Sequence, residues 1–260
     1  MSLFLFFVAL LASAVGSVVG AGGGVIIKPV LDLLGVLPVS TVSFCSGCTV
    51  LGMSVFSLIH NRKDGIRLHL KTSTLLAVGA VCGGLVGKAL FEAARAGGSE
   101  RMLGGLQAVF LTLITFGVLL YVCFKSRLPS RQVPSPIAVL VIGMALGVIS
   151  SFLGIGGGTS NVAVLFYFFS MNAKEAAKNS LYIIIFSQLS SIGSALVTGS
   201  VPAFSWPHLL FMVAGGIAGA AIGSAVSKRI NNSGVESILK VLLILITAVD
   251  LYNAVKYLLF

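Results

Sequence analysis

Charged side chains are scarce in this sequence: they make up 9% of its 260 residues, whereas hydrophobic residues make up 57%. Soluble globular domains carry roughly 25% charged residues. A chain with so few lacks the polar surface that a soluble fold needs, which excludes a soluble enzyme or binding domain. The sequence therefore predicts an integral membrane protein, with no soluble domain, linker or low-complexity tail between residues 1 and 260.

Residues that bind metals or form disulfides are also few. The three histidines show no ligand spacing and lie near the ends of apolar stretches: His60, His69 and His208. A structural zinc site needs about four ligands, so no metal and no cofactor is expected. The four cysteines fall within apolar stretches and are predicted to be free thiols: Cys45, Cys48, Cys82 and Cys123. The net charge of +10 comes from basic residues in short loops, so it indicates membrane topology and not nucleic-acid binding.

Long apolar stretches cover most of the chain. A membrane-spanning helix needs about 20 apolar residues, and these stretches are continuously apolar, whereas barrel strands alternate. Helices are therefore predicted at 2–20, 38–60, 69–91, 102–124, 137–153, 173–197, 208–227 and 235–259, with shorter apolar pieces at 25–34 and 160–170. The first stretch has neither a basic start nor a small-residue cleavage site, so it is interpreted as structure and not as a signal peptide.

The sequence contains an internal repeat. Residues 20–31, GAGGGVIIKPVL, and residues 154–165, GIGGGTSNVAVL, lie 134 positions apart. The same offset aligns Ser46 with Ser180 and Cys45 with Asn179. We predict two repeats, 1–128 and 129–260. Each consists of a glycine-broken helix, at 2–34 or 137–170, followed by three spans.

The loop charges favour an inverted arrangement of these repeats. Basic residues in short loops mark the cytoplasmic side, and three segments carry them: 61–71, 125–131 and 228–234. If each glycine-broken segment is a re-entrant hairpin, each repeat crosses the membrane three times. All three basic loops then lie inside and both termini lie outside. If every long stretch crosses, the repeats are parallel and the loop at 228–234 lies outside.

Two triple-glycine segments are the main candidate site: Gly22, Gly23 and Gly24, and Gly156, Gly157 and Gly158. Each precedes a short helical piece, and the first turn of a helix has unpaired N–H groups and a partial positive charge. In transporters built from inverted repeats, such ends point at an anionic substrate near the midplane. Alternatively, these glycines only permit close helix packing.

The two motifs, GAGGGVIIKPVL and GIGGG, each followed by a serine about 22 residues after the last glycine, resemble those of the TauE/SafE family, the sulfite exporter-like (TSUP) membrane transporters. The resemblance covers essentially the whole chain. It implies export of a small sulfur-containing anion such as sulfite, sulfoacetate or taurine. The chain departs from the family pattern at Ala163, where the first repeat has Pro29, and this affects the expected shape of the second half-helix.

Further polar residues in apolar segments are candidate substrate contacts, because hydroxyl and amide donors suit sulfonate oxygens. They are Cys45, Ser46, Thr159, Ser160, Asn161, Asn179, Ser180 and Gln188. Bonds between helices are the alternative role. Lys28 either contacts the substrate or pairs with Asp32 four residues later. Lys174 and Lys178 share a helix face at a membrane end, where they either attract an anion from the cytoplasm or extend into the headgroup region, as lysines at such ends commonly do.

Asp250 is the acid placed most deeply in a spanning segment, so it either carries a coupling proton or bonds to a neighbouring helix. The sequence as a whole predicts a multi-pass transporter of the bacterial inner membrane, with lipid and a small anion as its partners and with a homo-oligomer possible. An inside-negative potential drives anion export at about 2.3 kcal/mol per charge per 100 mV. The alternatives are an anion channel and a membrane-embedded thiol enzyme that uses Cys45 and Cys48.

Overall fold

The computed structural model describes residues 1–127, 130 and 132–259, and the regular elements in these ranges are all helical. Eight helices are long and apolar enough to span a membrane. They are α1 (Ser2–Val19), α3 (Val39–His60), α4 (Leu70–Gly97), α5 (Glu100–Phe124), α6 (Pro136–Leu153), α8 (Ala173–Val197), α9 (Trp206–Arg229) and α10 (Asn232–Leu259). Two shorter helices are α2 (Gly24–Leu34) and α7 (Gly158–Phe169), and η1 (Lys125–Arg127) is a single 3-10 turn. The predicted helices are thus confirmed.

Local sequence signals set the helix ends. α1 and α6 both stop at a glycine in the left-handed conformation, Gly20 with φ 73° and Gly154 with φ 67°. α8 begins with a capping box, in which the Asn172 side chain accepts from the Glu175 amide and the Glu175 carboxylate accepts from the Asn172 amide. Elsewhere the apolar sequence continues as helix, because backbone groups inside a bilayer must bond within their own segment.

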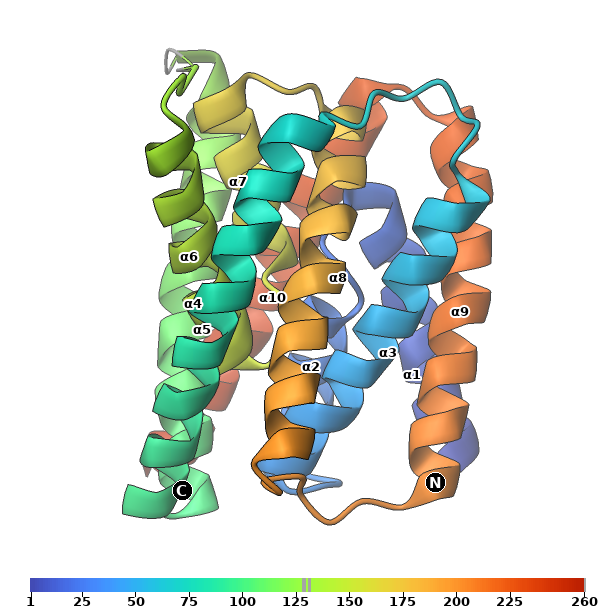
Figure 1. Ribbon diagram of the computed structural model, residues 1–260. Helices are drawn as coiled ribbons and strands as arrows, with labels where there is room; N and C mark the ends of the chain where they lie inside the picture. Colours follow the sequence, from blue (N-terminus) through green and yellow to red (C-terminus); the bar gives the residue numbers. More distant parts are fainter. Residues whose placement is uncertain (128–129, 131, 260) are drawn as a thin grey trace.

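The ten α-helices form one upright bundle (Figure 1). The start of α1 and the end of α10 lie at the same end of this bundle, together with the connection at 198–205. The loop at 61–69, the segment after α5 and the connection from α9 to α10 lie at the opposite end. The three basic loops of the sequence are therefore at one end. Arg131 of the second loop, and the expected repeat boundary at 128 and 129, lie outside the described residues.

Close helix contacts depend on small residues. Gly79, Gly83 and Gly87 of α4 face the backbone of α6, and added β-carbons would overlap Leu140, Met144 and Val148. Gly215, Gly219 and Gly223 of α9 face the backbone of α1 in the same way, at Phe6, Leu10 and Ala14. Both sets have the four-residue spacing of membrane helix interfaces. The first helix of each half of the chain thus packs on a helix of the other half.

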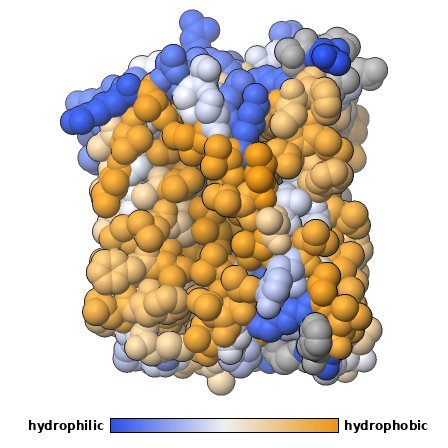
Figure 2. Space-filling view, turned by 180° about the vertical axis from the view of Figure 1, so that it is seen from behind, coloured by the Kyte–Doolittle hydropathy of each residue, from blue (hydrophilic) through white to orange (hydrophobic). Residues whose placement is uncertain are grey.

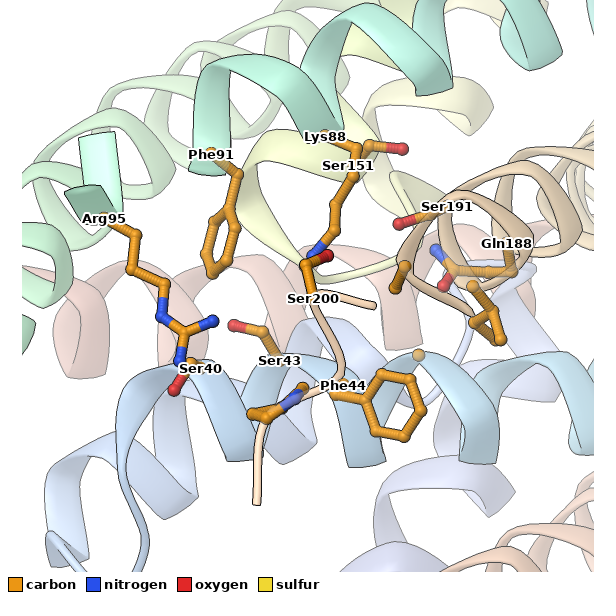
Figure 3. A pocket seen from close by; sticks show the side chains of 15 residues that line it. Ser40, Ser43, Phe44, Lys88, Phe91, Arg95, Ser151, Gln188, Ser191 and Ser200 are labelled. Carbon is orange, nitrogen blue, oxygen red and sulfur yellow. The ribbon is translucent and has the colours of Figure 1, made fainter. Parts of the chain in front are cut away.

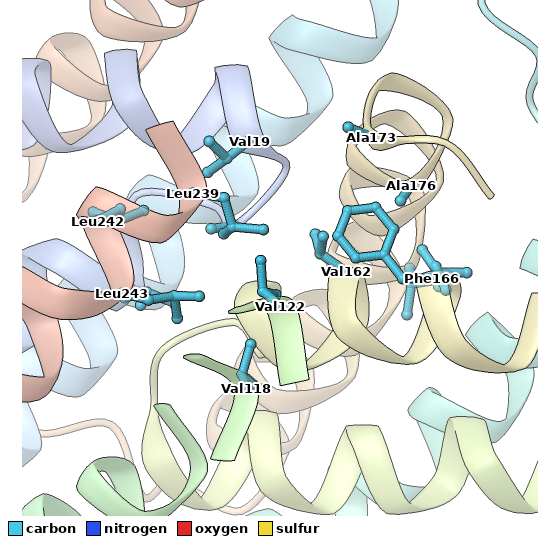
Figure 4. Packing of buried hydrophobic residues seen from close by; sticks show 14 of the residues in the cluster. Val19, Val118, Val122, Val162, Phe166, Ala173, Ala176, Leu239, Leu242 and Leu243 are labelled. Carbon is cyan, nitrogen blue, oxygen red and sulfur yellow. The ribbon is translucent and has the colours of Figure 1, made fainter. Parts of the chain in front are cut away.

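Apolar side chains cover the outside of the bundle as well as its interior. Figure 2 shows hydrophobic residues over the middle of one face, with hydrophilic residues gathered at the ends. Inside, side chains of α1, α5, α7, α8 and α10 form one cluster, in which Phe166 packs among valines and leucines (Figure 4). Because lipid is as apolar as the core, the exposed leucines and phenylalanines mark the membrane-facing surface.

Candidate functional site

Each of the two glycine motifs forms a sharp turn inside the bundle. Gly22 has φ 66°, Gly156 has φ 80° and Gly157 has φ 71°, a left-handed conformation that glycine adopts without strain. The residues of both turns, 20–24 and 155–158, are buried. We call residues 20–24 and 154–158 the two corners.

The two corners pack against each other at the centre of the fold. A β-carbon on Gly24 would meet the Ile155 carbonyl oxygen at 2.5 Å, and one on Gly158 would overlap the Ala21 backbone. Only glycine permits this approach, which brings together the N-terminal ends of α2 and α7. Both ends carry partial positive charge. Two such ends meeting inside a bundle favour a negative group beside them.

Apolar side chains fill the space on one side of the corners. Val50 lies against Gly22, Gly24 and Gly156, where added β-carbons would meet it at 3.2, 2.9 and 2.9 Å. Ile184 lies against Gly22 and Gly156, and belongs with Val50 and Met53 to one buried cluster. The Gly23 amide donates to the Met53 sulfur at 3.1 Å. One of the backbone N–H groups predicted to bind the anion therefore already donates a hydrogen bond within this structure.

A polar pocket opens on the other side of the corners, toward the end of the bundle that holds the termini (Figure 3). It is narrow, with a cavity volume of about 30 Å³. Its lining contains serines from α3, α6 and α8 with two cationic side chains from α4: Ser40, Ser43, Ser151, Ser191, Lys88 and Arg95. In Figure 3 the Arg95 side chain extends toward Ser40 and that of Lys88 toward Ser200. We call this the polar pocket.

Gln188 connects the polar pocket to the corners. It lines the pocket, and its Nε2 lies 3.5 Å from the position of a β-carbon on Gly156. Its Oε1 lies 2.7 Å from such a position on Gly47 of α3, so the side chain fits only because Gly47 has none. The structure thus places Gln188 next to both features.

Several buried hydroxyls near the corners have no hydrogen-bond partner among the described residues. They include Ser46, Thr159 and Ser160, together with Ser43, Ser150 and Ser151. Buried polar atoms are nearly always bonded, so unpartnered ones indicate water or a ligand. The first three were expected as contacts from the sequence. The last three escaped notice because each lies in an otherwise ordinary apolar segment.

Lys88 and Arg95 were also not recognised from the sequence. Lys88 forms an ion pair of 2.6 Å with Glu92, and Arg95 approaches Glu92 at 3.7 Å. Residues 92–101 carry as many acidic as basic side chains, so their sequence does not indicate a basic face on α4. The signal that was available is Lys88 itself, a cation inside the apolar stretch at 69–91.

Other candidate residues hold parts of the fold together. The Ser180 hydroxyl donates to the Gly20 carbonyl at 2.6 Å and so anchors a corner. Asn179 uses its whole amide on the 61–69 loop and its surroundings: its Oδ1 accepts from the His69 amide and the Ser73 hydroxyl, and its Nδ2 donates to the Arg67 and Glu175 carbonyls. Direct substrate contact by these two side chains would require them to give up these bonds.

Lys28 forms an ion pair with Asp32, which is one of the two roles predicted for it from the sequence. The Nζ to Oδ2 distance is 2.9 Å, and Lys28 is 1% exposed. Cys45 is buried and Cys48 is half-buried, and all four cysteines are free thiols, as predicted. Asp250 is buried on α10, where it contacts the Thr115 hydroxyl at 3.4 Å, and it does not line the polar pocket.

A second, basic pocket lies at the opposite end of the bundle, with a cavity volume of about 370 Å³. Lys63, Lys174 and Lys228 line it. Lys178, which lines a smaller pocket beside it, donates to the Asn61 and Ile66 carbonyls and forms an ion pair with Asp64. Both lysines at the start of α8 thus lie at this end, and Lys178 also fastens the 61–69 loop.

Comparison with known proteins places this architecture in one family. The sequence profile of the sulfite exporter TauE/SafE family matches residues 5–249. The chain belongs to this family. It is similar to a probable membrane transporter protein, YunE, of Bacillus subtilis (strain 168), with 22% identity over 95% of this chain and 96% of that protein. No solved structure matches it. This TauE/SafE protein is therefore a multi-pass membrane transporter.

Proposed function

We propose that this TauE/SafE protein exports a small sulfur-containing anion, sulfite or an organosulfonate such as sulfoacetate or taurine, across the bacterial inner membrane. The observation that carries the proposal is the meeting of two helix N-termini, α2 and α7, beside a pocket with unpartnered hydroxyls. Helix ends bind anions through N–H groups and partial charge. Hydroxyl donors add hydrogen bonds without a full charge that would hold the ion too tightly.

The chain is proposed to consist of two inverted repeats, 1–128 and 129–260. The packing supports this, because the contact of α1 with α9 is equivalent to that of α6 with α4. In addition, helices at equivalent positions of the two repeats contact each other, α3 with α8 and α5 with α10. α1 enters from the end that holds the termini and α6 from the opposite end (Figure 1). Each corner then belongs to a re-entrant hairpin. With three basic loops at one end, the charge rule assigns that end to the cytoplasm.

This assignment gives a transport route. Anions collect at the lysines of the basic pocket on the cytoplasmic side and leave through the polar pocket on the outside. Val50 and Ile184, which close the space between these pockets, act as the barrier that moves in alternating access. In the polar pocket, Lys88 is already paired with Glu92 at 2.6 Å. Its charge therefore guides an anion without binding it strongly. The membrane potential drives export of the anion.

Substitution of Gln188 by leucine tests the site. Leucine has similar bulk but donates no hydrogen bond, and a bond to a charged group is worth about 1.5–3 kcal/mol. We expect anion flux into proteoliposomes to fall roughly 10- to 100-fold. Leu189→Ala is the matched control, because Leu189 lies next in α8 but is 52% exposed on the outer surface.

The flux assay uses sulfite, sulfate, thiosulfate, taurine and sulfoacetate as separate substrates. Normal flux of every transported anion in Gln188→Leu, with the control also normal, would refute the site. Single-channel conductance would instead indicate a channel. Loss of function in Cys45→Ser/Cys48→Ser would favour the thiol enzyme, because a transporter is expected to retain flux.

A further inference from the structure

A cluster of buried charges lies between α2, α5 and α10, separate from the polar pocket. Lys28, Asp32 and Asp250 are 1%, 6% and 1% exposed. Lys28 forms its ion pair with Asp32 at 2.9 Å, and α10, which carries Asp250, packs against α2. One ammonium and two carboxylates leave one negative charge uncompensated when all three are ionised. An isolated charge is costly to bury, so a cation is needed here.

The hydrogen bonds at Asp250 favour a proton as that cation. A threonine hydroxyl has one proton to donate, and Thr115 Oγ1 lies 2.8 Å from the Leu111 carbonyl oxygen and 3.2 Å from that of Thr112, but 3.4 Å from Asp250 Oδ2. The Leu111 carbonyl is the nearest of these acceptors, and while it accepts this proton Thr115 offers Asp250 only an oxygen lone pair. A protonated Asp250 can donate to that lone pair, whereas an ionised one is left without a strong donor.

A second polar group beside the cluster also lacks a donor. Asn253 lies one turn beyond Asp250 on the same face of α10 and is 2% exposed. Its Nδ2 donates to the carbonyl of Pro29, the residue after Lys28, at 2.9 Å. Its Oδ1 has no hydrogen-bond partner among the described residues. This buried oxygen next to the cluster can accept a hydrogen bond from a group that carries a proton.

We infer that the Lys28–Asp32–Asp250 cluster is a proton-binding site in which Asp250 takes up one proton from water, and that this proton couples to anion transport. A bond forms between the proton and a carboxylate oxygen, and a hydronium ion becomes water. Lys28 lies one turn after Gly24, which packs against Ile155, so a charge change facing Lys28 acts on the helix that forms the corner. The coupling rests on the proposed function, whereas the proton binding does not.

Other titratable groups on the packed elements lie away from Asp250. α1 carries none in its sequence. Lys256 of α10 donates to the Leu33 carbonyl, and Glu236 of α10 pairs with Lys125 at 2.6 Å at the opposite end. The remaining ones are Arg101, Tyr121 and Cys123 of α5, Lys174, Glu175, Lys178 and Tyr182 of α8, and Lys240, Tyr252 and Tyr257 of α10.

Infrared difference spectroscopy of the purified full-length protein tests proton binding without any substrate. We expect a band from a protonated carboxyl group that changes with pH, and its complete loss in Asp250→Asn. Asp250→Glu keeps a carboxyl group and should retain a band, which guards against misfolding of the first variant. Glu236→Gln is the matched control on the same helix and should leave the band unchanged. A band absent from the wild type, or present in Asp250→Asn, would overturn the inference.

Flux measurements then test coupling. In proteoliposomes with the potential clamped at zero, a pH gradient should change wild-type sulfite or sulfoacetate flux, and Asp250→Asn should lose this response while downhill flux persists. Replacing sodium by choline should change nothing. Sodium-dependent flux, or a wild type insensitive to the gradient, would refute proton coupling. If no anion is transported at all, the proposed function fails, while the infrared result still decides the proton site.

Discussion

Ser46 and Ser180 occupy matching positions in the sequence but differ in the structure, and this difference predicts a loss of stability when Ser180 is replaced by alanine but none when Ser46 is. Ser180 donates to the Gly20 carbonyl at 2.6 Å, whereas the Ser46 hydroxyl, equally buried, has no partner among the described residues. Replacing Ser180 by alanine leaves a buried carbonyl at the corner without this donor. The cost of an unsatisfied buried group is about 1–3 kcal/mol.

The magnitude converts to a measurable shift. For a chain of this size, 1 kcal/mol moves the thermal midpoint by about 2–4 °C. Ser180→Ala should therefore unfold roughly 2–12 °C below the wild type in detergent. Ser46→Ala loses no hydrogen bond within the protein, so its midpoint should stay within about 1 °C, as for substitutions that remove no specific interaction.

Both variants are purified in one detergent and followed by the loss of monodisperse protein on heating. Transport of sulfite is measured in parallel, since Ser46 remains a proposed contact. Equal losses of stability in the two variants, or a larger loss in Ser46→Ala, would refute the assignment of Ser180 as the anchor of the corner. A loss of flux in Ser46→Ala without a loss of stability is the result expected for a side chain that contacts the anion.

Two further predictions concern buried and interfacial lysines. Lys28→Met removes the ammonium group that pairs with the buried Asp32, so the free energy of unfolding should drop by about 3–5 kcal/mol. The double variant Lys28→Met/Asp32→Leu should recover most of this loss. A double variant no more stable than the single one would contradict the pairing. Lys178→Gln removes the ion pair that fastens the 61–69 loop, so trypsin should cleave this loop several times faster than in the wild type. Unchanged cleavage, with Lys174→Gln as the control, would show that the loop is held by other contacts.

The spans were predictable from the sequence, because continuous apolar runs of this length have few alternatives in a membrane. Predictions of side-chain contacts were less complete. An asparagine side chain is suited to donate a hydrogen bond to an anion, yet the Asn179 amide already forms four hydrogen bonds, to the loop and the adjacent helix turns. Lys88 and Ser151 were missed because their role depends on α4, α6 and α8 converging on one pocket. Spacing along one helix does not reveal which helices converge.

The sequence by itself determined the membrane location, the two glycine motifs and the helices on either side of them. These follow from local causes: apolar length for the spans and freedom of φ for the turns. Only the tertiary structure decided that the corners pack on each other, that Val50 and Ile184 fill one side, and that the polar pocket opens on the other. Such contacts join residues more than a hundred positions apart. They depend on how the bundle fills its interior, which is a property of all the helices together.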